Sequence, residues 1–240
     1  MQQQPYFSVI IPTKNRPTYL RDAIRSVSNQ NFENYELIVS DNFNGPETEG
    51  VINEFKHHPN FKSIRTEREM SMPEHWEFAT AKASGKYVLL LTDRKVLFQH
   101  SLKRLHHFLH HKHKDALNCI SFGVQTYNEA ENKMAWNPQK ENTKEYSSDS
   151  LIQNFLNENY FGDSTLDRIF PKTLNGCYKN EYAQEIRTKY NSYFNTEHIT
   201  TPDYSSFFIK NYLVCLKTSY SVLIFYYNNL IYSSSSLSFV

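Results

Sequence analysis

The sequence predicts an α/β protein in which a mainly parallel central sheet is flanked by helices, in a Rossmann-like arrangement. Three short apolar runs, at residues 7–11, 35–40 and 87–91, are rich in Val, Ile and Leu, as buried strands are. The segments between them carry apolar residues at helical spacing. Strands that alternate with helices of this length imply right-handed crossovers and parallel pairing. With 240 residues, 39% of them apolar, the chain is long enough to bury a core.

The first hundred residues give the clearest succession of elements. Each expected strand is a short apolar run, and each expected helix has one apolar face. The turn after the second strand is indicated by clustered Asn, Gly and Pro. In chain order we expect a strand at 7–11, a helix at 18–30, a strand at 35–40, a turn at 42–46, a helix at 48–55, a strand at 61–65, a helix at 73–83 that stops at Ser84-Gly85, and a strand at 87–91.

The second half is less regular. A helix is expected at 101–114, where Leu102, Leu105 and Leu109 share one face, and a strand at 118–127. The polar stretch 128–150 is expected to form a loop or a hairpin. Further helices are expected at 151–156, 181–189 and 204–216, and a strand at 222–227. The serine run at 233–236 is more typical of a loop than of a terminus, which leaves open whether the chain is truncated.

Charge and cysteine content restrict the partners and the compartment. The formal charge is +1, so no overall field attracts nucleic acid or an anionic membrane, and any anion site must be local. The odd set Cys119, Cys177 and Cys215 forms no CxxC pair, which favours a reducing compartment. Lys14 and Arg16 interrupt the first apolar run, so we expect no signal peptide.

No apolar stretch in the sequence is long enough for a membrane-spanning helix; the longest candidate, 221–232, is broken by Asn228 and Asn229. We therefore expect a cytoplasmic protein, with the inner membrane face as an alternative location, no nucleic-acid partner and at most peripheral membrane association. The whole chain is expected to form one domain, 1–240.

Polar residues follow the expected strands at the edge where a ligand would bind. The sequence contains neither a GxGxxG dinucleotide fingerprint nor a GxxxxGK[ST] phosphate loop, so side chains must hold any nucleotide. Open α/β sheets bind ligands at the carboxyl ends of their strands. Those ends carry Pro12-Thr13-Lys14-Asn15-Arg16, Ser40-Asp41-Asn42 and Thr92-Asp93-Arg94.

These segments resemble a known family. FSVIIPTKNRPTYLRDAIRSVSNQNFENYELIVSDN is similar to the opening of family 2 glycosyltransferases of the GT-A fold. MPEHWEFATAKASGKYVLLLTDR resembles the run into the DxD strand of that family. The resemblance covers roughly residues 6–110 well and 150–230 loosely. It implies a GT-A fold and transfer of a sugar from a nucleotide-sugar donor. It also implies that the single domain has a nucleotide-sugar half to about residue 100 and an acceptor half from about 101 to 240.

The resemblance also implies roles for individual residues in donor binding. Asp41 would accept a hydrogen bond from the donor base; an Asx turn or a helix cap is the alternative. Asp93 would contact the ribose. Pro12, Thr13, Asn15 and Arg16 would line the pocket, or else serve only the turn and the helix start. Arg65 or Arg68 would reach the base or the phosphates, unless either is a solvated surface charge.

The DxD-like stretch departs from the family pattern at Arg94. The family usually offers a second carboxylate there, which holds Mg²⁺ or Mn²⁺, whereas this chain reads Thr92-Asp93-Arg94. One acid beside one guanidinium is a poor ligand set for a hard cation. No metal ligand is therefore predicted, and Mg²⁺ or Mn²⁺ is disfavoured. Arg94 would instead neutralise the diphosphate, since its planar fork suits phosphate oxygens. The alternative is an ancestral metal site that has decayed with loss of activity.

The catalytic base is expected later in the chain. Inverting transfer needs a group that takes the proton of the acceptor hydroxyl. By resemblance this is Asp203 in Thr201-Pro202-Asp203-Tyr204, ahead of a helix, with Glu197 in reserve; an N-cap aspartate is the alternative. Asn175-Gly176-Cys177-Tyr178 loosely resembles the acceptor-facing segment before the base.

Five histidines at 106–113 have spacings of four that suit a metal pair, but no HExxH-type context accompanies them. We interpret them as a solvated helix face.

The function expected from these observations is inverting transfer from a nucleoside-diphosphate sugar to a hydroxyl of a glycan, a lipid-linked sugar or a protein, and a UDP-sugar is the favoured donor. The setting would be synthesis of a cell-surface polysaccharide or glycoconjugate. The first alternative is a non-catalytic nucleotide-sugar-binding protein with a degenerate metal site. The second is a nucleotidyltransferase, which is disfavoured because PTKNRP has no glycine for a phosphate loop.

Overall fold

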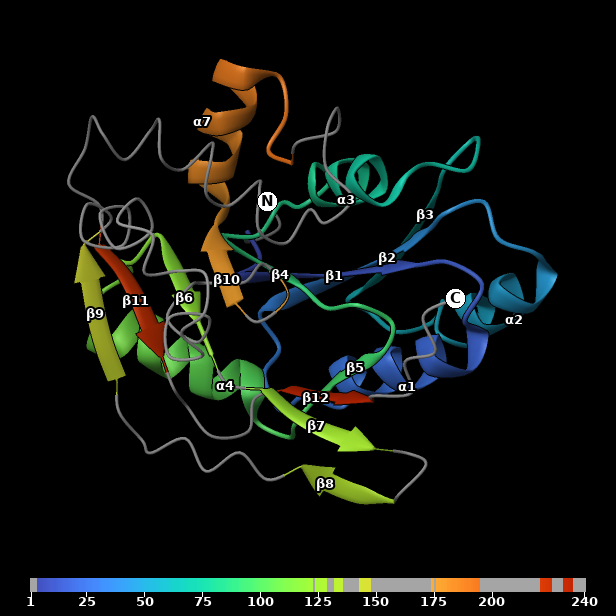
Figure 1. Cartoon of the computed structure of the whole chain (residues 1–240), viewed down its shortest axis with the longest axis horizontal. Helices are drawn as coiled ribbons and strands as arrows, with labels where there is room; N and C mark the ends of the chain where they lie inside the picture. Colours follow the sequence, from blue (N-terminus) through green and yellow to red (C-terminus); the bar gives the residue numbers. More distant parts are fainter. Residues whose placement is uncertain are drawn as a thin grey trace, which may run out of the picture.

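The structure, a computed structural model, describes residues 4–122, 124–128, 132–135, 143–147, 174, 176–194, 221–225 and 231–234 (Figure 1). Within these ranges the main sheet has eight strands in the order β3-β2-β1-β4-β10-β6-β11-β9. Its strands are β1 (Phe7–Thr13), β2 (Tyr35–Asp41), β3 (Phe61–Arg65), β4 (Tyr87–Leu90), β6 (Cys119–Ser121), β9 (Thr143–Ser147), β10 (Gly176–Lys179) and β11 (Ser221–Phe225).

Strands β3, β2, β1 and β4 are parallel, as the strand–helix alternation predicts. Beyond β4 the pairing is mixed: β10 is antiparallel to β4 and β6, and β11 is parallel to β6 and antiparallel to β9. Strands from the second half of the chain thus continue the sheet that the first half begins.

Helices cover both faces of the parallel strands (Figure 1). They are α1 (Pro17–Ser28), α2 (Pro46–Glu54), α3 (Met72–Thr80), α4 (Ser101–His106), the π-helix η1 (His107–Lys112) and α7 (Asn180–Tyr190). Because side chains alternate along a strand, Val9 and Ile11 pack with α1, α2 and α4 in one apolar cluster, whereas Ile10 packs with α3 and α7 in another. The fold is therefore α/β with helices on both sides of the sheet, which confirms the predicted class.

A second sheet has four strands in the order β5-β12-β7-β8. Its strands are β5 (Lys95–Leu97), β7 (Val124–Asn128), β8 (Lys133–Ala135) and β12 (Ile231–Ser234). The single strand expected at 118–127 is thus wrong: the chain divides near the buried Phe122, and β6 and β7 join different sheets. The stretch 128–150, expected to form a loop or a hairpin, contains β8, which pairs antiparallel with β7, and β9. The loop expected at 233–236 overlaps β12.

Three short strands, β5, β10 and β12, do not appear in the sequence prediction. Each has four residues or fewer and is defined by partners distant in sequence, so no local pattern marks it. The helix expected at 101–114 is present, but it changes from α4 to the π-helix η1 at His107. The helices expected at 151–156 and 204–216 lie outside the described residues.

The connection from α3 to β4 depends on a glycine. A Cβ at Gly85 would lie 2.7 Å from the backbone nitrogen of Ser8, so only glycine allows this close approach to β1. The helix stop predicted at Ser84-Gly85 comes a few residues late, since α3 ends at Thr80. In the part of the chain that the structure describes, no helix has the length and apolarity that a membrane crossing requires.

Candidate functional site

Strand register brings the predicted donor-binding side chains together. In the parallel ladder, Thr13 of β1 lies opposite Asp41 of β2, and Asp41 lies opposite Arg65 of β3. Each is the last residue of its strand, so the three form a row along the carboxyl edge of the sheet. The sequence predicted a site at this edge, and the register supplies the order of its members.

Asp41 is a buried carboxylate with two partners. Its side chain is 3% exposed, and its Oδ1 accepts a hydrogen bond of 2.8 Å from the backbone N–H of Asn44. Arg65 Nη1 lies 3.5 Å from Oδ2, as an ion pair rather than a close hydrogen bond. These contacts come from the turn after β2 and from the end of β3. Because each carboxylate oxygen has two lone pairs, Oδ2 retains acceptor capacity for another donor.

Asp93 is the second buried carboxylate at this edge. Its side chain is 2% exposed; Thr13 Oγ1 donates to its Oδ2 at 2.9 Å and Arg16 Nη1 to its Oδ1 at 3.2 Å. Burial raises the pKa of Asp93, although Arg16, Thr13 and the backbone N–H of Lys14 oppose that rise. An ionised Asp93 therefore lowers the stability of the folded state. Buried titratable groups of this kind are typical of ligand-binding sites.

The turn after β2 is held by asparagines that the sequence prediction did not single out. Asn44 accepts from the Asn15 N–H at 2.8 Å and donates to the Thr13 carbonyl at 3.1 Å. Asn42 exchanges hydrogen bonds of 2.8 and 2.9 Å with the backbone of Met70. These contacts tie the connections after β1, β2 and β3 to one another. The Asn-rich sequence between Asp41 and Gly45 was the available signal, but it indicated only a turn.

His75 is a further buried group that the sequence prediction missed. Its Nε2 lies 2.8 Å from Ser40 Oγ, which connects α3 to the end of β2. Burial lowers the pKa of His75 to about 4, so the ring is neutral at pH 7. A neutral imidazole beside Ser40 supports the strand end next to Asp41 without adding a charge there.

The structure separates the two arginines considered for the donor. Arg65 pairs with Asp41, whereas Arg68 Nη2 lies 3.3 Å from Glu74 Oε1 and Arg68 Nη1 donates to the carbonyl of Glu69. Lys14 and Glu69 form an ion pair beside them. Arg65 therefore belongs to the row of strand-end residues, and Arg68 lies in a surface ion-pair network.

The remaining predicted residues are placed as follows. Pro12 lies within β1 opposite Ser40, and Asn15 has a left-handed φ of 56° in the connection to α1. Arg94 is half-buried in the turn between β4 and β5. Asp203 and Glu197 lie outside the described residues. Cys177 and Tyr178, in the segment expected to face the acceptor, are 1% and 2% exposed in the core, so their side chains do not face an acceptor.

The described residues do not fit a hard divalent cation at Asp93. The Asp93 carboxylate is already ion-paired with Arg16, and the next residue along the chain is the cation Arg94. Among the described residues, no group of three or more His, Cys, Asp or Glu side chains is placed to hold a metal ion. Mg²⁺ prefers several oxygen ligands, which this part of the site does not supply.

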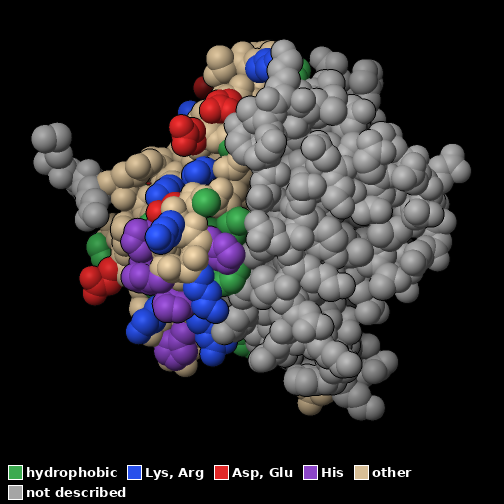
Figure 2. Space-filling view, turned by 90° about the vertical axis from the view of Figure 1, so that its left-hand side faces the viewer, with side chains coloured by type: hydrophobic (Ala, Val, Ile, Leu, Met, Phe, Trp, Pro, Cys, Tyr) green, Lys and Arg blue, Asp and Glu red, His purple; other side chains and the backbone are tan. Residues whose placement is uncertain are grey.

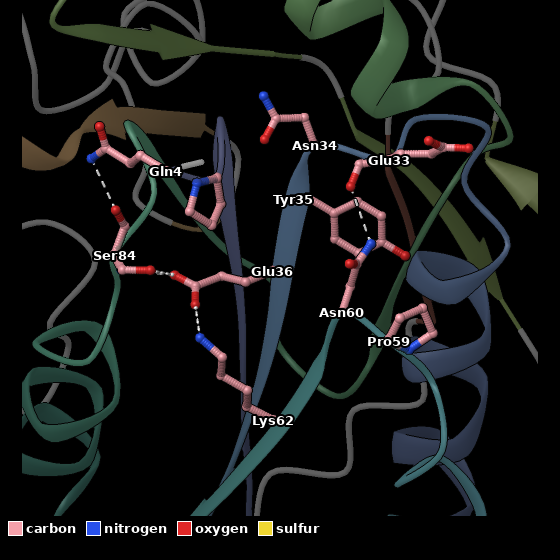
Figure 3. A pocket seen from close by; sticks show the side chains of 10 residues that line it. Gln4, Glu33, Asn34, Tyr35, Glu36, Pro59, Asn60, Lys62 and Ser84 are labelled. Carbon is pink, nitrogen blue, oxygen red and sulfur yellow. Dashed lines mark hydrogen bonds and ion pairs between the residues drawn. The ribbon is translucent and has the colours of Figure 1, made fainter. Parts of the chain in front are cut away.

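A hollow of about 490 Å³ lies at the opposite edge of the sheet, at the amino ends of the strands (Figure 3). Its lining includes Glu36, whose carboxylate accepts hydrogen bonds from Ser8 Oγ, from the Ser84 N–H and Oγ, and from Lys62 Nζ, at 2.6 to 2.8 Å. Each carboxylate oxygen of Glu36 thus already has a protein partner. We interpret Glu36 as a group that stabilises the fold.

The interpretation of Glu36 predicts a pH-dependent loss of stability. Burial raises the pKa of Glu36, but the hydrogen bonds from Lys62, Ser8 and Ser84 outweigh it and hold the pKa below its usual value. Its stabilisation is therefore present above the unfolded-state pKa and is lost as pH falls through the folded-state pKa. Glu36→Gln should lower the free energy of unfolding by about 1–3 kcal/mol at pH 7. Urea unfolding should show the deficit shrinking toward pH 3; an equal deficit at both pH values would contradict this.

The histidine-rich segment forms an exposed face (Figure 2). His107, His110 and His111 are exposed, while Leu102, Leu105 and Leu109 are buried as predicted. Burial and the neighbouring histidines lower the pKa of His106. His110 Nδ1 lies 2.9 Å from Asp115, which also pairs with Lys86. The interpretation of a solvated histidine face is confirmed for these exposed side chains.

Comparison with known proteins identifies the class of this fold. The structure superposes on Staphylococcus aureus TarS 1-349 in complex with UDP-GlcNAc with a TM-score of 0.72, at 19% identity over 97% of this chain and 59% of that one. It also superposes on the mannosyltransferase PcManGT from Pyrobaculum calidifontis, in complex with GDP-Man and Mn²⁺, with a TM-score of 0.61, at 12% identity over 98% and 58% of the two chains. The fold is that of GT-A glycosyltransferases.

Sequence comparison then gives the family. Residues 8–178 match the model of glycosyl transferase family 2. The GalNAc(5)-diNAcBac-PP-undecaprenol beta-1,3-glucosyltransferase of Campylobacter jejuni is 33% identical over 103 residues, 42% of this chain and 33% of that protein. The poly(ribitol-phosphate) beta-N-acetylglucosaminyltransferase TarS of S. aureus is 26% identical over 121 residues, 49% of this chain and 21% of TarS. The chain belongs to glycosyl transferase family 2. The matched regions span a third or less of these two relatives.

Proposed function

We propose that this chain transfers a sugar, with inversion, from a nucleoside-diphosphate sugar to a hydroxyl acceptor. The observation that carries the proposal is the pair of buried carboxylates, Asp41 and Asp93, at the carboxyl edge of a family 2 glycosyltransferase sheet. Each is paired with a half-exposed arginine, so anionic and cationic groups meet at one edge. This arrangement suits a ligand that combines hydrogen-bond donors with phosphates.

The proposed division of roles follows from the chemistry of each group. Asp41 Oδ2 accepts a hydrogen bond from the base, and Asp93 accepts from the ribose hydroxyls. Arg94 neutralises the diphosphate, with Arg16 and Thr13 orienting Asp93 through the contacts described above. Pro12 and Asn15 shape the connection after β1, and Arg65 adds positive charge beside the base. Asp203 takes the proton of the acceptor hydroxyl as the sugar is transferred.

The donor and the setting are proposed by analogy with the relatives. A UDP-sugar is the favoured donor, because a structural neighbour is a complex with UDP-GlcNAc. The acceptor is a glycan, a lipid-linked sugar or a protein; one relative is named for an undecaprenol-linked substrate. We propose a cytoplasmic enzyme of cell-surface glycan synthesis, associated at most peripherally with the inner membrane face. We also propose that the chain forms one domain, with a nucleotide-sugar half to about residue 100 and an acceptor half after it.

A thermal-shift screen over UDP, GDP, CMP and dTDP and their sugars tests the proposal. A ligand that binds only the folded state raises the melting temperature. A shift with UDP and UDP-sugars, followed by UDP release, would support a transferase. A shift without turnover would favour the alternative, a non-catalytic nucleotide-sugar-binding protein. No shift with any of these nucleotides would contradict both.

We further predict that donor binding does not need a metal ion. A divalent cation about 4 Å from the Arg94 guanidinium would meet a repulsion of about 8 kcal/mol at an effective dielectric constant of about 20, because two unit charges at that separation repel by about 4 kcal/mol. UDP binding measured by calorimetry should persist in excess EDTA, and Arg94→Ala should weaken it. Arg94→Asp should bind UDP more tightly with Mn²⁺ than without. Binding by the unmodified protein that EDTA abolishes and Mn²⁺ restores would contradict the prediction.

A further inference from the structure

An aromatic ring stands at the rim of the proposed donor site. Phe43 lies two residues after Asp41, in the turn between β2 and α2, and it is 55% exposed. Among the described residues, Phe43 and Met72 are the large apolar side chains that stand exposed. A single exposed apolar side chain is common on protein surfaces, so exposure alone indicates no function. The backbone of Phe43 adds the second observation.

Phe43 has a φ of 57°, in the left-handed region. A bulky side chain seldom adopts this conformation, whereas Gly and Asn tolerate it. The neighbouring positions are Asn42, Asn44 and Gly45, so the turn contains tolerant residue types but places a phenylalanine at the strained position. Backbone strain of this kind is concentrated at ligand sites, where the surrounding structure maintains it.

The ring is also fixed beside Asp41 by a shared partner. The Arg65 guanidinium lies 5.6 Å from the centroid of the Phe43 ring, within the range of a cation–π contact. The same guanidinium pairs with Asp41 at 3.5 Å and donates to the Asn44 carbonyl at 2.7 Å. One arginine therefore holds an aromatic face and a carboxylate acceptor next to each other.

We propose that the Phe43 ring is the stacking platform for the nucleobase of the donor, with Asp41 accepting a hydrogen bond from the edge of the base. A nucleobase has an apolar π-face and a polar edge, and the ring and the carboxylate match these two features. Stacking tolerates any base, whereas the acceptor selects bases with a donor on the facing edge. This inference rests on the proposed function and assigns the base-binding part of the site.

The test replaces the ring without changing the backbone preference. Phe43→Asn keeps a residue that tolerates a positive φ, so its melting temperature should equal or exceed that of the unmodified protein. Calorimetry should show binding of UDP and UMP weakened about five- to 150-fold, the range for loss of a base–aromatic stack. Phe43→Tyr keeps an aromatic ring and should bind UDP with the affinity of the unmodified protein. Lys114→Asn is the matched control: it is exposed, has a φ of 50°, and should leave UDP binding unchanged.

Inorganic pyrophosphate separates stacking from a general effect on the site, because it has phosphates but no base. Its affinity should be the same for the unmodified protein and Phe43→Asn. Equal UDP affinity in a folded Phe43→Asn variant would overturn the assignment and leave the proposed function intact. The assignment would also be overturned if Phe43→Asn weakened pyrophosphate binding as much as UDP binding, or if Phe43→Tyr bound UDP as weakly as Phe43→Asn does. Absence of UDP binding by the unmodified protein would instead reject the donor on which the assignment depends.

Discussion

Replacing Asp203 with Asn is expected to reduce turnover by about 10²-fold or more while leaving donor affinity nearly unchanged. The substitution keeps the shape of the side chain and removes its basicity, so the acceptor hydroxyl would have to lose its proton without assistance. In the proposed site, donor binding depends on Asp41, Asp93 and their neighbours, and the substitution leaves these residues unchanged. The measurement is the rate of UDP release from the sugar nucleotide chosen by the thermal-shift screen, with calorimetry of UDP alongside.

A second variant and the melting temperature show whether Asp203 is the catalytic base. Glu197→Gln removes a nearby carboxylate in the sequence and should retain turnover if Asp203 is the base. A large fall with Glu197→Gln and none with Asp203→Asn would transfer the role to Glu197. If Asp203→Asn lowers the melting temperature and keeps the rate, Asp203 is a helix cap and the assignment of the base is wrong.

The second large effect is expected at Asp41. Asp41→Asn preserves an acceptor for the Asn44 N–H but presents an uncharged amide toward the base. UDP binding should weaken by about 1.5–3 kcal/mol, the range for a hydrogen bond to a charged group, which is roughly ten- to 150-fold in Kd. Calorimetry with UDP measures this directly. Circular dichroism would confirm that the variant keeps its fold.

Glu36 supplies the matched control for Asp41. It is a buried carboxylate of the same strand, β2, with a lysine partner in β3, but it lies at the amino end. Glu36→Gln should therefore cost stability and leave UDP affinity unchanged, the reverse of Asp41→Asn. If both variants weaken UDP binding equally, the loss reflects general damage to the sheet, and Asp41 would be removed from the donor site.

The first hundred residues could be predicted closely because their signals are local. Apolar runs indicated β1, β2 and β4, and Asp41 and Asp93, at the ends of the second and third of these runs, indicated the proposed ligand edge. The pairings of β5, β10 and β12 could not be predicted, since these short strands are defined by distant partners. The partners of Asp41 and Asp93 depend on register and turn geometry. Phe43 was missed for the same reason: the sequence indicated a turn there but not a left-handed φ at the aromatic residue.

The strand-end row of Thr13, Asp41 and Arg65 has a consequence for how this chain tolerates changes in length. The three residues meet only because their strands pair in one register. Deleting one residue inside β2 would shift Asp41 relative to both neighbours and turn every following side chain to the opposite face of the sheet. Insertions between α2 and β3 would leave the alignment intact, whereas the connection from α3 to β4 is constrained by the close approach of Gly85 to Ser8. Length variants with a retained site are therefore expected between α2 and β3, and indels within these strands would abolish the site.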